Sequence, residues 1–157
     1  METLASTFVY RHTRIQIVTQ RPTEFIDITD GLQRLISEAG IGIGFINVHG
    51  LHTTTAIVIN EHEPLLLKDF VRVFEATAPD DGRYDHDDAA IRTVNLTEGE
   101  HPNGHAHCRA LFLSPSACLN ILDGRLVLGR WQRIFLVELD GPRPRDLSVL
   151  MLGEGGQ

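Results

Sequence analysis

Short runs rich in β-branched and aromatic residues recur along this chain, and turn residues separate most of them. Such runs occupy residues 7–19, 41–49, 54–60, 117–122, 125–128, 133–139 and 147–152. Runs of this composition and length predict β-strands. Asp123-Gly124, between two of the runs, is a dipeptide typical of a tight hairpin.

Two segments predict helices. After Asp30 apolar residues repeat with helical spacing, so Asp30 is the expected N-cap, Gln33 is placed to reach back to it, and Gly40 is the expected left-handed stop. A second helix is expected to begin at Pro64 and to end before Pro79. Its inward-facing side chains are predicted to be Leu66, Phe70, Val73 and Phe74.

Strands and helices do not alternate regularly as βαβ units, which favours an α+β fold over a doubly wound α/β fold. The length of 157 residues fits one domain. We therefore predict a single compact domain over residues 1–157, with an antiparallel, β-rich, sandwich- or barrel-like core and two main helices.

The formal net charge of −7 offers no general basic surface to nucleic acid or to an anionic membrane. A phosphorylated ligand must therefore be met by local groups. Cys108 and Cys118 lie outside any zinc-finger or CxxC spacing, so they are expected to be reduced thiols that pack as small hydrophobic side chains. The N-terminus does not resemble a signal peptide and the apolar runs are too short for a bilayer, so we expect a cytoplasmic protein.

Histidines are concentrated in three polar segments. His52 precedes three threonines, His86 lies among aspartates, and His105 and His107 follow Asn103-Gly104. Imidazole is the commonest metal ligand, and a catalytic metal site typically has three protein ligands. Convergence of these three segments would give such a site. The spacing matches no known metal motif, so surface or hydrogen-bonded histidines remain the alternative.

Carboxylates near these segments are candidates for acid–base roles. Asp87 follows His86 and either belongs to a solvated acidic loop or orients an imidazole. Glu61 ends an apolar strand, where partial burial would raise its pKa and suit a general base, although a strand-end cap is the alternative. Glu138 lies in an apolar run, and if it faces inward it needs a cation such as Arg143 or Arg145.

Trp131 and Gln132 form the only tryptophan-bearing turn. A tryptophan is usually part of a core, but its polar neighbours make a pocket wall an alternative.

Four segments together resemble the YjbQ-like family, small proteins that include secondary thiamine-phosphate synthase enzymes. They are HTTTAIVINEHEP (52–64), YDH (84–86), NGHAHCRALFL (103–113) and DGRLVLGRWQRIFLVELDGPRPR (123–145). The resemblance covers about residues 50–149. It implies a compact α+β protein that assembles as a homotrimer and holds a divalent metal ion.

Carried onto this chain, the resemblance implies His52, His86 and His107 as metal ligands, with His105 nearby. It also implies that Glu61, Trp131, Gln132 and Glu138 line the pocket. Two departures from the family pattern are Cys108-Arg109 after the histidine and Arg130 before the tryptophan.

Three functions remain open at this stage. The resemblance implies thiamine-phosphate synthase activity, which joins a hydroxymethylpyrimidine diphosphate to a thiazole phosphate. Three imidazoles suit zinc better than the magnesium that diphosphate chemistry usually employs, which favours a zinc-dependent hydrolase. The third possibility is a non-enzymatic trimeric module that binds a metal or an anion. The expected ligand in the enzymatic cases is a phosphorylated small molecule.

Overall fold

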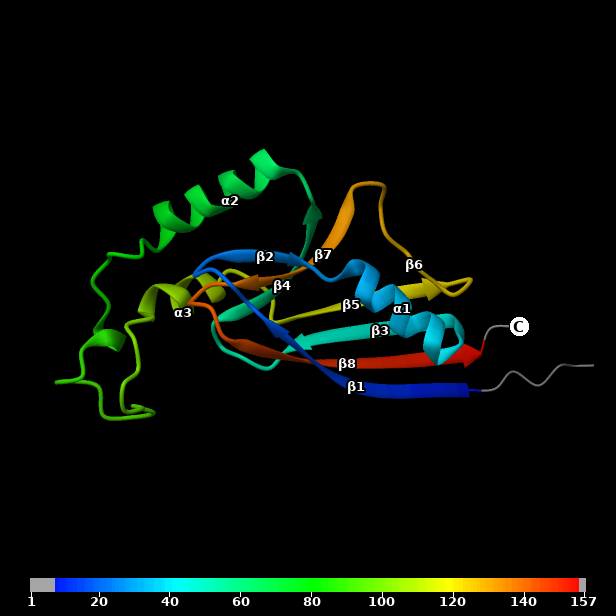
Figure 1. Cartoon of the computed structure of the whole chain (residues 1–157), viewed down its shortest axis with the longest axis horizontal. Coiled ribbons are helices and arrows are strands. Elements are labelled where there is room, and N and C mark those ends of the chain that lie inside the picture. Colours follow the sequence, from blue (N-terminus) through cyan, green and yellow to red (C-terminus); the bar gives the residue numbers. More distant parts are fainter. Residues whose placement is uncertain (1–7, 156–157) are drawn as a thin grey trace, which may run out of the picture.

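The computed structural model describes residues 8–155, and these form two antiparallel β-sheets, three α-helices and one 3-10 turn (Figure 1). The larger sheet has the order β1 (Phe8–Val18), β8 (Pro144–Gly155), β3 (Ile41–Gly50), β5 (Ser116–Leu122) and β6 (Arg125–Leu126). The smaller sheet has the order β2 (Glu24–Asp27), β7 (Gln132–Glu138) and β4 (Thr55–Glu61). The helices are α1 (Thr29–Ala39), α2 (Pro64–Thr77) and α3 (Gly104–Ala110), and the 3-10 turn is η1 (Asp85–Asp87).

The predicted α+β class and antiparallel core are confirmed, because every strand pairing in the described chain is antiparallel. Each sheet keeps two edge strands within the described residues, so the arrangement is an open pair of sheets and not a barrel.

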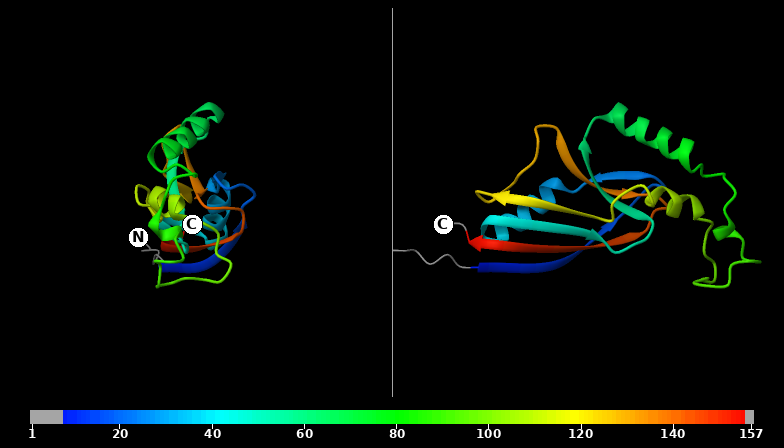
Figure 2. Two further views of the ribbon diagram at one scale, coloured as in Figure 1. Left: turned by 90° about the vertical axis from the view of Figure 1, so that its left-hand side faces the viewer. Right: turned by 180° about the vertical axis from the view of Figure 1, so that it is seen from behind.

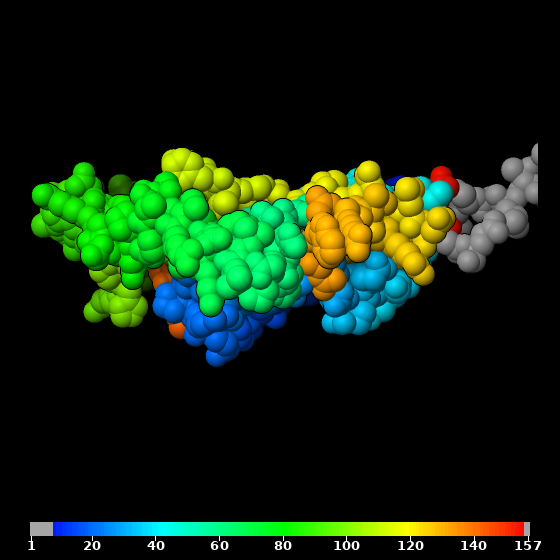
Figure 3. Space-filling model, turned by 90° about the horizontal axis from the view of Figure 1, so that it is seen from above, coloured from blue at the N-terminus to red at the C-terminus, as the bar shows by residue number. Residues whose placement is uncertain are grey.

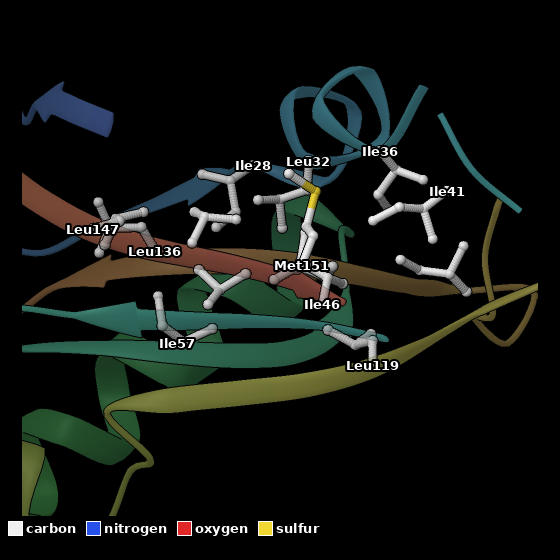
Figure 4. Close-up of a cluster of buried hydrophobic side chains, with 14 residues drawn as sticks. Ile28, Leu32, Ile36, Ile41, Ile46, Ile57, Leu119, Leu136, Leu147 and Met151 are labelled. Carbon is white, nitrogen blue, oxygen red and sulfur yellow. The ribbon is translucent and has the colours of Figure 1, made fainter. Parts of the chain in front are cut away.

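The main core lies between the inner face of the larger sheet, the smaller sheet and α1. Leu32 and Ile36 of α1 point toward Met151 of β8 and Ile46 of β3, and all four are fully buried (Figure 4). Helical spacing puts the two α1 residues on one face, and strand alternation puts the sheet residues on one face. Burial of each such side chain contributes about 1.5–3 kcal/mol.

Strand β7 is buried on both faces. Ile134 and Leu136 belong to the main core, whereas Phe135 and Val137 belong to a second core under α2 and α3. Phe25 of β2 stacks on Phe74 of α2, with ring centroids 6.1 Å apart. Burial on both faces explains why this strand is an apolar run without alternation in the sequence.

Helix α2 has the predicted bounds, with Pro64 in its first turn and the Glu63 side chain accepting hydrogen bonds from two backbone N–H groups. The prediction that Val73 faces inward is wrong, because its side chain is 59% exposed. The half-buried residues of this face are Leu66, Leu67, Phe70, Val71 and Phe74.

The predicted capping of α1 is wrong at its start but right at its end. The helix begins two residues earlier, with Ile28 in place of Asp30 at the N-cap position, and the carboxylate of Asp27 accepts the N–H of Thr29. Gln33 does not reach back to Asp30; its side chain bonds to Gly124 O and Leu126 N across the core. Gly40 has a φ of 67°, the left-handed conformation expected of a C-cap.

The Asp123-Gly124 hairpin is confirmed, since both residues have the positive φ values of a tight turn, 51° and 71°. Strand β2 and helix α3 were not predicted. The two cysteines are free as expected, but both are exposed, so the expectation that they pack as small hydrophobic side chains is wrong.

The molecule is elongated (Figures 1 and 2). The segment between α2 and α3 lies at one end, and the outer ends of β1 and β8 lie at the other. Seen from above, α2 lies next to the turn that precedes β7 (Figure 3). No helix within residues 8–155 has the length and apolar character needed to span a bilayer.

Candidate functional site

His52, His86 and His107 line one cavity of about 460 Å³, which we call the histidine cavity. His52 lies between β3 and β4, His86 lies in η1, and His107 lies on α3. The cavity therefore forms where the end of β3, the end of β7 and the start of β8 meet the segment between α2 and α3 (Figure 1). Its other lining residues are Leu51, Thr53, Thr54, Arg92, Asn95, Glu100, Asn103, Asp140, Arg143 and Arg145.

Contacts between η1 and α3 bring two of the histidines together. Asp87 Oδ1 accepts the N–H groups of Asn103, at 2.9 Å, and Gly104, at 2.8 Å, and so fixes the start of α3. A Cβ on Gly104 would lie 2.4 Å from the Cβ of Tyr84, so only glycine permits this approach. The rings of His86 and His107 consequently lie 4.6 Å apart, centroid to centroid.

The environment of His107 favours its neutral form. Burial lowers the pKa of His107, and the neighbouring His86 lowers it further. Two imidazoles this close do not readily carry a positive charge at the same time. The neutral ring of His107 is therefore suited to binding a cation or to accepting a proton.

His52 is held by strand β8. The backbone N–H of Asp146 donates to Nε2 of His52 at 2.8 Å, so Nε2 carries no proton. Burial, followed by the charge of Arg145, lowers the pKa of His52, which favours the neutral ring. A neutral imidazole with an unprotonated Nε2 has its proton on Nδ1, so His52 is a hydrogen-bond donor through that atom.

Three arginines line the cavity of this acidic protein, and each also contacts a carboxylate. Arg92 pairs with Glu100 at 2.9 Å, and Arg143 pairs with Asp140 at 2.8 Å. Arg145 uses Nε and Nη2 to bind Glu138, which leaves Nη1 for a further acceptor. The carboxylates orient the guanidinium groups, and the remaining N–H groups of Arg143 and Arg145 suit phosphate oxygens. The N–H groups of Arg92 are already used, because they bind Glu100 and the carbonyl oxygens of residues 86, 94 and 95.

Glu138, predicted to need a cation if it faced inward, is fully buried and paired with Arg145. Its Oε1 also accepts the N–H groups of residues 139, 140 and 141, and its Oε2 accepts the hydroxyl of Thr19. Burial alone would raise the pKa of Glu138, but the hydrogen bonds from Arg145 and from the Asp140 N–H outweigh burial and lower it. Glu138 is thus ionised and positions Arg145.

Three buried side-chain polar atoms within residues 8–155 have no hydrogen-bond partner: Thr55 Oγ1, His86 Nε2 and Asn103 Oδ1. His86 and Asn103 line the histidine cavity, and Thr55 lines a second cavity beside it. A buried polar atom without a partner costs about 1–3 kcal/mol. Such atoms are rare in native proteins, and their placement here favours a polar ligand.

The residues fit the predicted three-histidine metal site only in part. His86 and His107 fit, because their rings are adjacent and Nε2 of His86 has no partner. His52 does not fit as it lies, since the Asp146 N–H occupies its unprotonated nitrogen. Accordingly, no group of three or more histidine, cysteine, aspartate or glutamate side chains in the described part of the chain is arranged to bind a metal ion.

Glu61, Trp131 and Gln132 lie at the opposite end of the smaller sheet. Glu61 pairs with Gln132, whereas Thr55 pairs with Glu138 near the cavity. At about 3.3 Å per residue, the two ends of β7 lie roughly 20 Å apart. Glu61 is exposed and Trp131 is 61% exposed, so within one chain these three residues do not line the histidine cavity.

The remaining positions singled out in the sequence lie outside this cavity. His105 is buried on the other side of α3, where its Nε2 lies 3.2 Å from Asp80. Arg109 is buried and binds Glu75 at 2.7 Å. Arg130 lies over the ring of Trp131, 4.5 Å from its centroid.

Sequence reasoning missed several lining residues, namely Arg92, Asn95, Glu100, Asn103 and Asp140. The first three lie in a segment without periodicity, so no local signal marks them. From the sequence, Arg143 and Arg145 are predicted only as cations that could pair with Glu138, and not as residues that line a cavity.

The family model described as UPF0047 protein YjbQ-like matches residues 13–154. A UPF0047 protein of Methanothermobacter thermautotrophicus is 39% identical over 136 residues, which are 87% of each chain. A UPF0047 protein of Archaeoglobus fulgidus is 37% identical over 138 residues, covering 88% of this chain and 98% of that protein.

Solved structures agree. A YbjQ-like protein of unknown function from Sulfolobus solfataricus has a TM-score of 0.81 at 35% identity, covering 94% of this chain and 100% of that one. A hypothetical protein from Aeropyrum pernix has a TM-score of 0.79 at 33% identity, covering 92% and 99%. The chain therefore belongs to the YjbQ-like UPF0047 family.

Proposed function

We propose that the histidine cavity binds the phosphate groups of a small phosphorylated substrate, and that the protein is a transferase with thiamine-phosphate synthase activity. The cavity carries the proposal, because three arginines meet two unpartnered polar atoms there in a chain of net charge −7. The synthase reaction releases diphosphate, and a site of this kind would hold the departing group.

Arg145 and Arg143 are the main expected phosphate contacts. Arg145 is 2% exposed and held by Glu138, so it loses little conformational freedom when a ligand binds. Arg143 is 44% exposed and lies beside Asp140. The Nδ1–H of His52 would add a neutral donor, and the pair His86 and His107 would supply a proton to the leaving oxygen or accept one.

Calorimetric titration with inorganic diphosphate tests the binding site. We expect Arg143→Gln to weaken diphosphate binding at least tenfold, because a charge-assisted hydrogen bond contributes about 1.5–3 kcal/mol. The matched control is Arg130→Gln, at the opposite end of the smaller sheet, which should change the dissociation constant less than twofold. Equal effects of the two substitutions would contradict the proposed site.

The reaction is tested by incubating the protein with hydroxymethylpyrimidine diphosphate and thiazole phosphate, with each of several divalent ions, and measuring thiamine phosphate. We expect His86→Gln to lose most activity and His62→Gln, a histidine outside the cavity, to retain it. Absence of product with every ion, at protein concentrations near those of the substrates, would end the synthase proposal.

Zinc is the proposed ion, with His86 and His107 as its protein ligands. Imidazole nitrogens suit zinc, which would act as a Lewis acid toward the phosphate oxygens. Elemental analysis after equilibrium dialysis should find about one zinc per chain. His86→Ala and His107→Ala should abolish binding, whereas His52→Ala should largely retain it. Full retention of zinc in all three variants would exclude this site.

A zinc-dependent hydrolase is the second candidate, favoured by the unpartnered Nε2 of His86. A hydrolase panel on the zinc-loaded protein distinguishes it, with His107→Ala as the blank. A non-enzymatic module that binds a metal or an anion is the conclusion if diphosphate or zinc binds and neither reaction occurs.

We also propose that the protein is a cytoplasmic homotrimer. Support for self-association comes from the outer face of the larger sheet, where Tyr10 and Phe45 flank Leu152 in register. Tyr10 is 74% exposed and Phe45 is 40% exposed, and Phe8, Ile43 and Leu122 extend the same apolar face. Light scattering should give three times the chain mass, and Phe45→Glu should reduce it. A monomeric wild-type protein would overturn this part.

A further inference from the structure

A second cavity of about 440 Å³ adjoins the histidine cavity, and we call it the threonine cavity. The two share the loop residues 51–53. The rest of the threonine cavity is lined by residues of β3, β4 and α3 and by the turn before β5, among them Gly50, Thr55, Ala110 and Pro115. Cavities of this size hold small organic molecules.

The two cavities differ in chemistry. The histidine cavity has three arginines and two carboxylates in its wall. The described residues that line the threonine cavity include no arginine, lysine, aspartate or glutamate; its polar groups are those of His49, His52 and two threonines. One compartment therefore suits phosphate groups, and the other suits an uncharged group of largely apolar surface.

Thr55 gives the threonine cavity a specific polar group. The residue is 3% exposed, and its hydroxyl is one of the three buried side-chain atoms of the described chain without a partner. Thr54, its neighbour, accepts a hydrogen bond from Arg145 and lines the other cavity. The two adjacent threonines thus line different cavities. The hydroxyl of Thr54 is hydrogen-bonded to Arg145, whereas the hydroxyl of Thr55 has no partner within the described residues.

We propose that the threonine cavity binds the uncharged ring of a phosphorylated substrate, with the Thr55 hydroxyl as a hydrogen-bond partner and the phosphates in the histidine cavity. This inference rests on the proposed function and adds to it a binding site for the ring of the substrate. His52 is in the wall of both cavities, and its attachment to the Asp146 N–H fixes the boundary between them.

Titration with three probes tests the proposal: inorganic diphosphate, hydroxymethylpyrimidine diphosphate, and the hydroxymethylpyrimidine alcohol. The wild-type protein should bind the organic diphosphate at least about tenfold more tightly than inorganic diphosphate, because the ring removes apolar surface from water when it enters the threonine cavity. Ala110→Phe, which fills the threonine cavity, should reduce that ratio to below twofold without changing the affinity for inorganic diphosphate. Ala76→Phe, at an exposed position on α2, is the matched control and should change neither.

Thr55→Val provides a variant that keeps the shape of the side chain. It should weaken the organic diphosphate about fivefold and leave inorganic diphosphate unchanged, because it removes one hydrogen-bonding group. Its melting temperature should equal or exceed that of the wild type, which separates loss of binding from loss of folding.

The outcomes separate this inference from the proposed function. Equal affinities of the wild type for the organic and inorganic diphosphates, or equal losses for both in Ala110→Phe, would overturn the inference alone. If no diphosphate binds, the proposed function falls. Even in that case, binding of the alcohol by the wild type and its loss in Ala110→Phe would support a ring site. If the wild type binds neither a diphosphate nor the alcohol, the proposed function and this inference are both overturned.

Discussion

Two polar clusters, each with histidine, aspartate and arginine, occupy opposite ends of the smaller sheet, and they differ in how completely their atoms are paired. At the start of β7, Asp27 Oδ2 accepts from Arg133 Nε at 2.6 Å and from His62 Nδ1 at 3.0 Å. Its Oδ1 accepts the N–H of Thr29, whose hydroxyl in turn accepts the N–H of Ile134. This cluster, which we call the paired cluster, stabilises the fold without a ligand.

At the end of β7, the histidine cavity combines the buried Glu138–Arg145 pair with unpartnered atoms on His86 and Asn103. Histidine, aspartate and arginine occur in both clusters. What distinguishes a candidate binding site from a structural ion pair is therefore the presence of buried polar atoms whose partners are missing from the protein.

The largest expected effect concerns the buried pair. Arg145→Met leaves Glu138 as an uncompensated charge at a fully buried position, so we expect a loss of about 3–5 kcal/mol in the free energy of unfolding. Arg133→Met, in the paired cluster, should lose about 1 kcal/mol, because Arg133 is 35% exposed. Urea unfolding at pH 7 measures both. Similar losses would remove the distinction between the two ion pairs.

Next in size is the contribution of Asp27 in the paired cluster. Burial would raise its pKa, but hydrogen bonds from Arg133, Thr29 and His62 outweigh burial and lower the pKa from 3.8 to about 2. The shift corresponds to about 2 kcal/mol. Because the folded pKa is depressed, this stability is complete above about pH 4–5 and is lost as the pH falls toward 2.

Asp27→Asn should therefore destabilise the protein by about 2 kcal/mol at pH 6, with a smaller difference from the wild type at pH 3. Denaturant unfolding at both pH values measures the change. A difference that does not depend on pH would mean that the charge of Asp27 does not stabilise the cluster.

The smallest expected effects compare two buried threonines. Thr29→Val leaves the N–H of Ile134 without its acceptor and should cost about 1–2 kcal/mol. Thr55→Val removes a hydroxyl that has no partner, so stability should stay within about 0.5 kcal/mol or rise. Thermal unfolding of the two variants side by side checks the sign. A loss in Thr55→Val as large as that in Thr29→Val would show that Thr55 is structurally paired.

The sequence predicted most strands and both long helices, because their apolar patterns are local. It missed α3, whose seven residues, GHAHCRA, have no apolar repeat. That helix depends on a tertiary contact, the Asp87 carboxylate at its first N–H groups. Strand β2 was missed because it has only four residues and takes its register from β7.

Composition predicted that three histidine segments converge, and the structure places His52, His86 and His107 around one cavity. It did not predict how each nitrogen is used. The Asp146 N–H that occupies His52 belongs to a strand almost a hundred residues away, and no local pattern indicates such a bond. The arginines are likewise distributed over distant segments, and only the fold shows that they share a wall.

The two hydrogen bonds that the Asp87 carboxylate accepts from the start of α3 hold the ends of the segment 88–102 together. This segment contributes Arg92, Asn95 and Glu100 to the wall of the histidine cavity, whereas His86 and His107 lie outside the segment. Insertions or deletions within residues 88–102 would thus alter which molecules can enter the histidine cavity and would leave the His86–His107 pair in place. Evolution or engineering can adjust selectivity here independently of the reactive groups.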